Sequence, residues 1–445
     1  MSSTLSLRTG AWYGDRNIEL EIPPYWDVNI VRPNTPMPLT KKQIEINLQN
    51  PTGQDSIKNL CKGKSRPLII IDDLNRPTPT DSIIDILLNW FQDASIPLRD
   101  VTILMATGSH GKPAQDAFPK KVGEKAAKSC RLLVHDCFSS NKKVGKTSFG
   151  TKIYANPALL GSDFVLGIGG IYPNWTAGFG GGTKLALGVL GIQSIFDLHF
   201  HHQGIGWGNE GSDDCSFRKD LNEVAHMIGL DTAVSVQVNA NREIIRVDSG
   251  DPTKFYPDAT NFCRQTFGFP ASDDADVVIS DTYPNDLSLT FAKMKGFAPF
   301  ELSKPTASKI AIASCGEGIG LHNIFPFINM PRFQKEKHFI RLLRAFGIKW
   351  VSTKILKRLW RMTAQPTNQL TSPQKPANNH SILLYRPDKN LNNLPSNIPG
   401  ITQLQEWSDI IQTVRKEQQD RDRVKVSVYP CAFLQFPNPP QQNPE

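Results

Sequence analysis

Short apolar runs of strand length constrain the fold of this 445-residue chain more than any other feature. Residues 67–72 and 101–106 each form such a run, which is typical of a strand buried on both faces of a parallel sheet. Between the two runs, apolar residues recur at helical spacing, namely Ile83, Ile84, Leu87, Leu88 and Phe91. Strands that alternate with helices indicate βαβ units, so the pattern predicts an α/β fold.

The length predicts two domains, because a single hydrophobic core rarely grows beyond roughly 250–300 residues. The polar stretch over residues 251–276 is interpreted as the junction between them. The same alternation then restarts, with strands expected at 277–280, 309–314, 381–385 and 424–429 and a helix at 286–296. We therefore expect mainly parallel, Rossmann-like sheets and an active site in the interdomain cleft. The expected division is an N-terminal domain over 1–270, a C-terminal domain over 271–435 and a disordered tail over 436–445.

Composition argues against several classes of protein. The hydrophobic fraction of 39% and the charged fraction of 21% are typical of packed globular domains. No apolar run approaches the ~18 residues that span a bilayer, and the N-terminus lacks a secretory pattern, so we expect a cytoplasmic protein without membrane contacts. The seven cysteines are an odd number at irregular spacings, which favours reduced thiols over a disulfide framework or a zinc ribbon.

The net charge of +8 raises the question of nucleic-acid binding. The excess is concentrated over residues 335–361, where apolar residues at helical spacing indicate the solvated face of a helix. We therefore expect no nucleic-acid partner. An anionic small-molecule substrate would suit the charge equally well.

Chemically capable side chains follow the predicted strands at their carboxyl ends, where open α/β sheets gather ligands. Asp73 and Arg76 follow the first apolar run, His110 follows the second, and Asn174 follows a third run at 164–168. Each of these residues alone is more often structural than functional. Their shared position in the predicted topology is what indicates a site.

A glycine-rich run that ends at Lys184 has a chemistry of its own. Gly180, Gly181 and Gly182 allow backbone amides to approach a phosphate closely and to adopt positive φ. A helix expected to begin near Thr183 would place Lys184 in its first turn, beside that anion site. Lys184 follows Thr183 rather than Gly and is not followed by Ser or Thr, so the run is not a Walker A loop. It predicts a site for a nucleotide-type phosphate, without support for ATP hydrolysis.

Three histidines lie close together downstream, at His199, His201 and His202. Neutral imidazole is a good ligand for nickel, zinc and copper, so the cluster is a candidate metal site. A surface cluster without function is an equally open interpretation of these residues.

Taken together, these segments resemble the nickel-pincer nucleotide enzymes of the lactate racemase family. The resemblance covers most of the chain and rests on segments in matching order. They are Asp72-Asp-Leu-Asn-Arg-Pro-Thr-Pro79, Ala106-Thr-Gly-Ser-His110, Ala177-Gly-Phe-Gly-Gly-Gly-Thr-Lys184, the stretch from Gly188 to His199, and Gly316-Glu-Gly-Ile-Gly320. Such an ordered set is far more specific than a single glycine motif.

The resemblance implies a cofactor made from a pyridinium mononucleotide that carries two sulfur groups and a carbon-bound nickel. In the family this cofactor is tethered through a thioamide to a lysine, which Lys184 matches. His199 matches the histidine that completes the nickel coordination, after a one-residue deletion before Gly188. The resemblance also implies cofactor-synthesis enzymes as partners. The glycines at 180–182 would contribute to cofactor binding.

The implied reaction is racemisation or epimerisation of a small anionic 2-hydroxy acid. A base removes the hydroxyl proton, the C2 hydride passes to the cofactor, and the keto acid is then reduced on its other face. His110 matches one of two acid/base histidines of the family. Asp73 and Arg76 match residues that line the cofactor and substrate site.

The positions that would handle the substrate depart from the family pattern. The second acid/base histidine aligns with Asn174, whose amide cannot cycle through a protonated form at neutral pH. A glutamine and a lysine on the family's substrate helix align with Phe291 and Met294. Either Lys293 or Lys295 is a candidate to replace the lost charge, although a shift of one residue turns a helical side chain by about 100°.

These departures leave three interpretations open. The chain is a racemase or epimerase of a bulkier or less polar 2-hydroxy acid than lactate, with Tyr172, another histidine or water serving the second face. Alternatively, it keeps one base and runs a one-sided redox reaction or epimerises a sugar-acid-like substrate. In the third interpretation it binds the cofactor without turnover. His110 and Arg76 speak against the third, because a carrier needs no base, and we expect the first.

Overall fold

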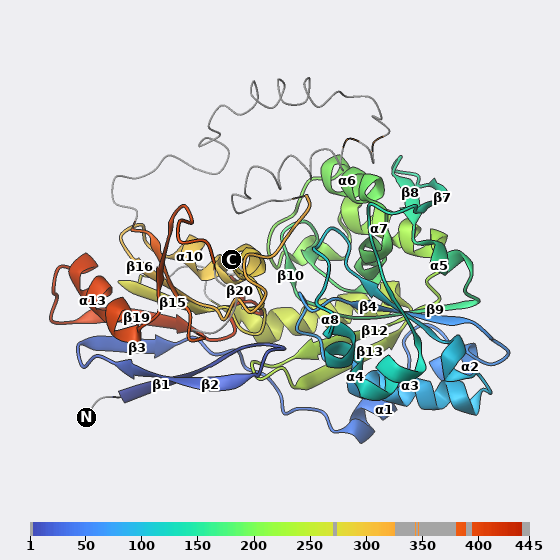
Figure 1. Cartoon of the computed structure of the whole chain (residues 1–445), viewed down its shortest axis with the longest axis horizontal. Coiled ribbons are helices and arrows are strands. Elements are labelled where there is room, and N and C mark those ends of the chain that lie inside the picture. Colours follow the sequence, from blue (N-terminus) through green and yellow to red (C-terminus); the bar gives the residue numbers. More distant parts are fainter. Residues whose placement is uncertain are drawn as a thin grey trace, which may run out of the picture.

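The computed structural model of the protein describes residues 3–269, 274–324, 380–388 and 394–437, together with the single residues 343 and 346. Two six-stranded sheets lie along the long axis of the molecule, the sheet of the N-terminal half at the right in Figure 1 and the other at the left. Their strand orders are β13-β12-β9-β4-β5-β6 and β18-β17-β16-β15-β19-β3. All neighbouring strands in these sheets pair in parallel except β12 and β13. The predicted α/β fold with two mainly parallel sheets is confirmed.

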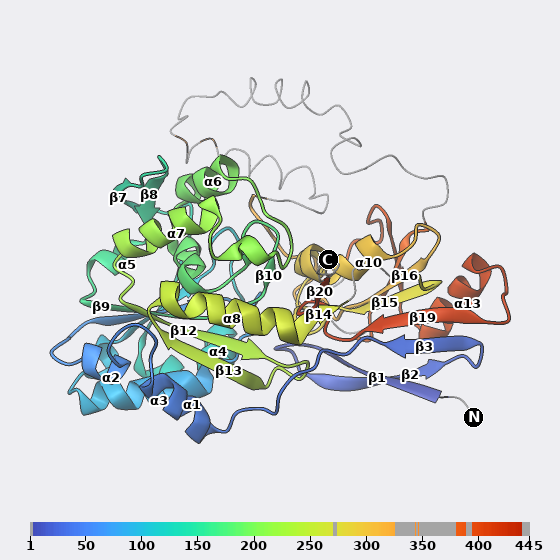
Figure 2. The ribbon, with the colours of Figure 1, turned by 180° about the vertical axis from the view of Figure 1, so that it is seen from behind.

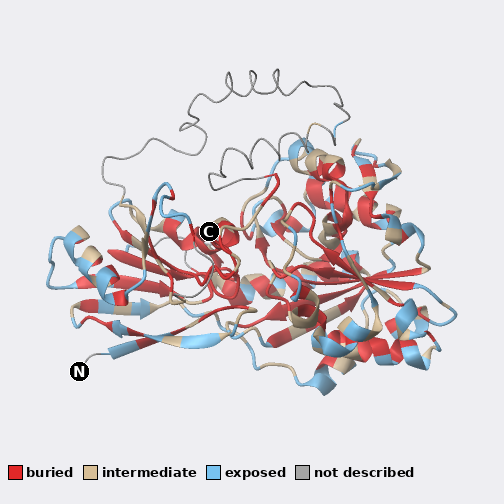
Figure 3. Ribbon diagram, viewed as in Figure 1, coloured by how far each residue is buried: buried red, intermediate tan, exposed pale blue. Residues whose placement is uncertain are grey.

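The first sheet has β4 (Pro67–Asp72) near its centre, buried along its whole length. Its strands in spatial order from the edge are β6 (Arg131–Val134), β5 (Thr102–Ala106), β4, β9 (Phe164–Gly170), β12 (Thr232–Val238) and the antiparallel β13 (Ile244–Gly250). Burial on both faces explains why the central strands are continuous apolar runs in the sequence. Figure 3 shows the strands of both sheets as mostly buried.

Alternate residues of β4 contribute to two cores, as the two-residue period of a strand requires. Ile69 and Ile71 belong to a core with α1 (Lys41–Gln49), α3 (Asp81–Asp93), α4 (Ala117–Ser129) and α8 (Pro252–Phe267). Leu68 and Ile70 belong to the opposite core, with η2 (Gly182–Val189), α6 (Ile192–His201) and α7 (Ser216–Met227). Figure 2 shows α6 and α7 on one side of this sheet and α1 and α3 on the other.

The second sheet has β15 (Val277–Asp281) between β16 (Ser308–Ile312) and β19 (Val424–Tyr429). It continues through β17 (Ile382–Tyr385) to β18 (Ile401–Leu404) on one side. Its other edge is β3 (Trp26–Ile30), which pairs in parallel with β19. The predicted boundary assigned residues 1–270 to the first domain, yet residues 26–30 complete the sheet of the C-terminal half. Only alternate residues of this edge strand are shielded, so it lacks the long apolar run that marks a central strand.

Shorter elements complete the fold. The hairpin of β1 (Ser3–Thr9) and β2 (Arg16–Ile22) packs with α13 (Trp407–Glu417) on the core of the second sheet. The remaining elements are α2 (Ile57–Leu60), η1 (Leu98–Asp100), β7 (Lys142–Lys146), β8 (Lys152–Ala155), α5 (Pro157–Leu160), β10 (Pro173–Asn174), β11 (Gly178–Phe179), η3 (Glu210–Ser212), α9 (Leu289–Phe291), the π-helix η4 (Ala292–Gly296) and α10 (Ala298–Leu302).

The polar stretch over 251–276, interpreted above as a junction, is mostly the helix α8. The Asp251 side chain caps this helix by accepting from Thr253 N at 2.8 Å, and Phe255, Tyr256 and Ala259 form its buried side. The polar residues that indicated a linker form the outer face of the helix. After it, β14 (Gly268–Phe269) pairs with β20 (Phe436–Pro437), so two residues of the predicted tail form a strand.

Several predictions concern parts of the chain that the structure leaves undescribed. Residues 438–445 of the predicted tail, and the helical surface over 335–361 apart from residues 343 and 346, lie outside the described residues. The seven cysteines, all within the described ranges, form no disulfide with one another. Within the described ranges, no helix has the length and apolar character needed to cross a bilayer.

Candidate active site

A cavity of about 570 Å³ lies between the two sheets, lined by residues of both halves of the chain. It brings together all the side chains that the sequence predicted for the site, namely Asp73, Arg76, His110, Asn174, Lys184 and His199. Gly180 and Gly181 line it as well, whereas Gly182 lies against Tyr256 at the start of η2. The other half contributes residues that include Phe291, Lys293, Met294, Lys295 and His322.

An aspartate–histidine pair stands where β4 and β5 end. Oδ2 of Asp73 lies 2.7 Å from Nδ1 of His110 and accepts a hydrogen bond from Asn75 at 2.8 Å. Burial alone would raise the pKa of Asp73, but His110 and then Arg76 lower it to about 2, so the carboxylate is ionised at neutral pH. An ionised partner at Nδ1 favours the tautomer whose lone pair is on Nε2.

The imidazole of this pair is set up to accept a proton. Burial lowers the pKa of His110, and the opposing effect of Asp73 does not fully offset it. The ring is therefore neutral near pH 7. A neutral histidine oriented by a carboxylate is the arrangement of a general base.

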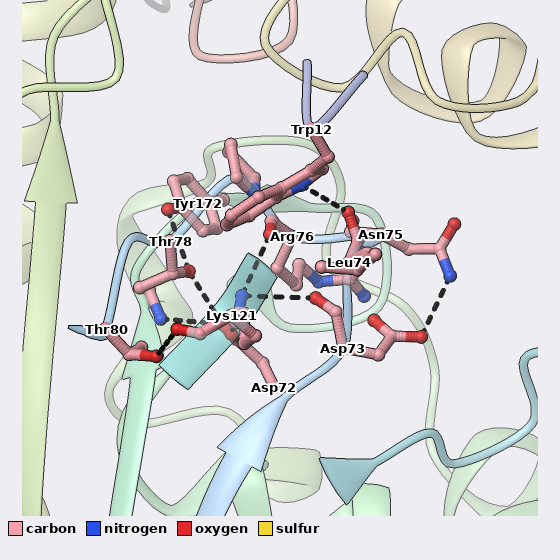
Figure 4. A network of polar contacts seen from close by, with 12 residues as sticks. Trp12, Asp72, Asp73, Leu74, Asn75, Arg76, Thr78, Thr80, Lys121 and Tyr172 are labelled. Atoms are coloured by element: carbon pink, nitrogen blue, oxygen red, sulfur yellow. Dashed lines mark hydrogen bonds and ion pairs between the residues drawn. The ribbon is translucent and has the colours of Figure 1, made fainter. Parts of the chain in front are cut away.

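A buried lysine that no sequence pattern indicated, Lys121 of α4, holds the loop after β4 in place (Figure 4). Its Nζ lies 2.6 Å from Oδ1 of Asp72 and donates to the carbonyl oxygens of Asp73 at 3.2 Å and Arg76 at 3.1 Å. The hydroxyl of Thr78 donates to the other oxygen of Asp72 at 2.7 Å. Asp72, which itself lines the cavity, and Lys121 thus form a buried ion pair at the base of this loop. A lysine inside a polar helical segment is normally on the surface, which is why its burial was not predicted.

Of the three glycines for which the sequence predicted positive φ, Gly181 and Gly182 have it and Gly180 does not. Gly181 and Gly182 have φ of 72° and 56°, and a Cβ on Gly181 would lie 2.5 Å from Ile171 Cγ1. Arg218, a buried residue of α7 that the sequence did not single out, donates to the carbonyl oxygens of Gly181 and Phe179, both at 2.9 Å. These contacts position the run ahead of η2.

Lys184 lies in η2 with its side chain in the cavity. Its backbone N–H donates to Gly181 O at 3.1 Å, and its Nζ lies 5.4 Å from the centre of the Phe217 ring. Burial, followed by the charges of Arg76 and Arg218, lowers the pKa of Lys184 to about 7. A large fraction of this amine is neutral near pH 7, which a lysine needs in order to act as a nucleophile.

His199 is the only one of the three neighbouring histidines, all of them described, that lines the cavity. Its Nδ1 donates to Ile195 O at 2.8 Å, which leaves the lone pair of the neutral ring on Nε2. Burial and then Lys184 lower the pKa of His199 to about 3. His202 instead contacts Asp220 at 2.8 Å and Ser216 at 3.0 Å. Within the described residues, no group of three or more His, Cys, Asp or Glu side chains is placed to hold a metal ion.

Asn174 lines the cavity, but its amide oxygen is engaged in the local turn. Oδ1 accepts from the backbone N–H groups of Thr176 and Ala177, both at 3.0 Å. The next residue, Trp175, donates from its indole to Met294 O at 3.0 Å and so connects the two halves of the chain. Asn174 therefore shapes the turn between β10 and β11.

The wall from the C-terminal half is built on a helix that widens into a π turn. Phe291 ends α9 and η4 follows over Ala292–Gly296, with Lys295 almost fully buried in the cavity wall. Burial, then Arg76 and Lys184, lower the pKa of Lys295, whereas burial alone lowers the pKa of Lys293. Lys295 is therefore the lysine that shares the cavity's electrostatic environment with Arg76 and Lys184.

His322 also lines the cavity, although no sequence pattern points to it. It follows the glycine motif at 316–320, which itself follows the carboxyl end of β16. It forms an antiparallel bridge with His110, and their ring centres lie 5.5 Å apart. The ring of Phe291 lies 4.7 Å from that of His110 and 6.1 Å from that of His322. Its position after a strand of the second sheet is the one signal that could have indicated it.

The fold and the cavity define a two-domain α/β protein whose candidate active site lies between two Rossmann-like sheets. Residues 13–208 match the lactate racemase N-terminal domain. The predicted resemblance to the lactate racemase family is thereby confirmed.

Two curated relatives share this similarity. The chain is 28% identical over 292 residues to a lactate racemase of Lactiplantibacillus plantarum, a match that covers 63% of this chain and 67% of the relative. It is 26% identical over 287 residues to a lactate racemase of Thermoanaerobacterium thermosaccharolyticum, a match that covers 61% of this chain and 65% of the relative. The aligned parts span about two thirds of each relative.

Solved structures show the same fold. The lactate racemase apoprotein of Thermoanaerobacterium thermosaccharolyticum superposes with a TM-score of 0.68 at 19% identity, over 98% of this chain and all of that one. A protein from Thermotoga maritima superposes with a TM-score of 0.58 at 15% identity, over 91% of this chain and all of that one. The homologues support an enzyme of the racemase class.

Proposed function

We propose that the protein is a racemase or epimerase of a 2-hydroxy acid other than lactate, and that it uses a nickel-pincer nucleotide bound covalently through Lys184. One observation carries the proposal. A single cavity brings Lys184, with its lowered pKa, together with the Asp73–His110 pair and His199. Cofactor-synthesis enzymes as partners and a cytoplasmic location follow from the same proposal.

The residues present fit this cofactor. A partly neutral Lys184 amine is suited to form a thioamide, and Nε2 of a neutral His199 is suited to ligate nickel. The described residues offer no protein-only metal cluster, so a metal in this cavity would take its other ligands from a bound molecule. The glycine run, with Gly181 and Gly182 at positive φ, suits the phosphate of a nucleotide. When bound, the group would supply nickel and an acceptor for the C2 hydride of the substrate.

The chain's own side chains would bind the acid and move its hydroxyl proton. Arg76 and Lys295 are suited to the substrate carboxylate, because both side chains line the cavity and both can donate hydrogen bonds to an anion. Nε2 of His110 would accept the hydroxyl proton, with Asp73 stabilising the imidazolium that forms.

The substrate is proposed to carry a larger or less polar group than the methyl of lactate. Phe291 takes the position of the family's glutamine, and its ring lies against His110 at 4.7 Å. Met294 and Trp175 line the same cavity. An aromatic and thioether wall favours an apolar substituent over a small polar one, because burial of apolar area stabilises the complex.

A one-base redox enzyme or sugar-acid epimerase remains the alternative, and the engagement of Asn174 in its turn favours it. Tyr172 is unsuited to the second base. Its hydroxyl lies 3.0 Å from that of Thr78, and burial followed by the charge of Asp72 raises its pKa far above neutrality.

The test is co-expression with the cofactor-synthesis enzymes, followed by intact mass, peptide mapping and nickel analysis. We expect a nickel-containing adduct on Lys184 that Lys184→Arg lacks, because a guanidinium cannot form the thioamide. Chiral chromatography over a panel of 2-hydroxy acids, lactate included, then identifies the substrate. Absence of both adduct and nickel in the wild type would overturn the proposal.

A further inference from the structure

We propose that His322 is the second acid/base residue of the cavity and exchanges the hydroxyl proton of the substrate enantiomer that His110 does not serve. The inference rests on the proposed function, the interconversion of 2-hydroxy acid enantiomers at this site. It assigns a catalytic role to a residue in the C-terminal half that the family resemblance, as carried by the sequence motifs, leaves without one.

The stereochemistry of the substrate defines where a second base must lie. If the carboxylate is held by cations and the C2 hydrogen points at the hydride acceptor, the two enantiomers differ only by exchanging the hydroxyl and the remaining substituent. Both positions are bonded to the same carbon, so each of the two proton acceptors must reach one of two neighbouring oxygen positions. Each acceptor must also be within hydrogen-bond reach, roughly 2.6–3.2 Å, of its hydroxyl position.

His322 meets this requirement. Its ring centre lies 5.5 Å from that of His110, and the planes are tilted by 54°, so the two rings are neighbours where the two halves of the chain meet. Phe291 lies beside both rings, at 4.7 Å and 6.1 Å, where the substituent of either enantiomer would contact it. The three side chains thus provide two proton acceptors and one apolar surface at the same place.

The position of His322 is fixed by backbone contacts across the two halves of the chain. Gly111 N donates to Leu321 O at 3.0 Å, and Asn323 N donates to Ser109 O at 2.8 Å. These bonds flank the bridge between His110 and His322 and hold both backbones in register. His322 is 8% exposed, and its Nε2 lies 3.5 Å from Ser109 Oγ.

The competing groups are less suited to this role. Asn174 has an amide that cannot carry the proton, and the hydroxyl of Tyr172 is held by Thr78. Lys295 shares its surroundings with Arg76 and is suited to the carboxylate. Among the described residues that line the cavity, the remaining histidine is His199, whose Nδ1 faces the backbone of its own helix.

A ring nitrogen of neutral His322 takes the hydroxyl proton as the O–H bond breaks and the C2–O double bond forms. The electron pair of the C2–H bond would leave as hydride to the acceptor that the bound cofactor of the proposed function would supply. The products are a 2-keto acid and an imidazolium. In reverse, His322 returns its proton to the oxygen as hydride returns to C2.

The test measures the oxidation of each enantiomer to keto acid separately, as a half-reaction. Overall racemisation cannot separate the two bases, because the fixed equilibrium between enantiomers makes a variant slow both directions equally. Loaded wild type, His110→Asn, His322→Asn and His322→Gln are each mixed in excess over one enantiomer. Keto acid is then quantified after rapid quenching. The glutamine variant is included in case the asparagine variant fails to fold. His226→Asn, an exposed histidine of α7, is the matched control.

We expect both His322 variants to slow oxidation of one enantiomer by about 100-fold or more and that of the other by less than about 3-fold, since general base catalysis contributes about 10²–10⁴-fold. His110→Asn should show the opposite preference, and His226→Asn neither effect. The Lys184 adduct mass, circular dichroism and keto-acid affinity should match wild type in the His322 variants.

Two outcomes would overturn the assignment while leaving the proposed function intact. They are an unchanged half-reaction in both His322 variants, or equal slowing of both enantiomers, with the wild type still racemising its substrate. If loaded wild type racemises no member of the panel, the proposed function fails and the role of His322 fails with it.

Discussion

The two walls of the cavity differ in how their side chains are held. The wall from the N-terminal half consists of loops that directly follow β4, β5 and β9, and buried ionic groups support it from behind, as the Lys121–Asp72 pair shows. The wall from the C-terminal half consists of the π turn around Lys295 and the loop around His322, joined to the first wall by backbone hydrogen bonds. The first wall suits a covalently held cofactor. Substitutions in the second wall can change substrate preference without disturbing the side chains of the first wall.

If the first wall depends on its buried support, removal of Lys121 should have the largest effect on stability. Lys121→Met leaves the Asp72 carboxylate buried without its cation, and breaking one partner of a buried pair costs about 3–5 kcal/mol. Urea unfolding should show a loss of that size in the free energy of unfolding. Lys128→Met, which removes an exposed pair with Glu124, should cost less than about 1 kcal/mol.

A double variant distinguishes the ion pair from simple packing. Lys121→Met combined with Asp72→Asn should recover part of the loss, because the amide carries no charge that needs a partner. A Lys121→Met protein as stable as wild type would show that the loop after β4 does not depend on this support.

The second wall makes its own prediction, through the two lysines of the π turn. Lys295→Met should raise KM for the 2-hydroxy acid by about 10–100-fold, because a hydrogen bond to a charged group contributes about 1.5–3 kcal/mol. Lys293→Met, which removes a half-buried lysine of the same turn, should change KM by less than about 3-fold. Steady-state kinetics on the loaded enzyme measures both. Equal increases in KM for the two variants would show that the π turn does not place Lys295 rather than Lys293 at the substrate carboxylate.

The same contrast explains what could be predicted from the sequence. The strands β4, β5 and β9 were predicted because central parallel strands are continuous apolar runs, and Asp73 and His110 follow such strands directly. Lys121 and Arg218 were missed because their burial depends on packing between elements distant in the sequence. The choice between Lys293 and Lys295 depends on a π turn, which has no sequence signature. His322 was missed because its place beside His110 arises from pairing between two loops.

A pH-dependent prediction concerns Lys184 before the cofactor is attached. Its pKa of about 7 means that the neutral, reactive amine increases as pH rises through 7, whereas ordinary lysines remain almost fully protonated there. Reductive methylation of the unloaded protein, followed by peptide mass spectrometry, should label Lys184 about 10-fold faster at pH 8 than at pH 6. A half-maximal rate near pH 10, as for exposed lysines, would contradict the desolvated environment of this amine.

The last prediction concerns Asn174, for which two hypotheses about the second base predict opposite results. If the site lacks a second base, Asn174→His should restore the family's pair and raise racemisation by 10-fold or more. If His322 already serves as that base, the substitution should change the rate by less than about 3-fold. It would also remove the oxygen that accepts from Thr176 N and Ala177 N, so a lower melting temperature is expected. Chiral assays of Asn174→His, alone and combined with His322→Asn, distinguish the two hypotheses. A histidine at position 174 can rescue the His322 variant only if the two positions reach the same substrate oxygen.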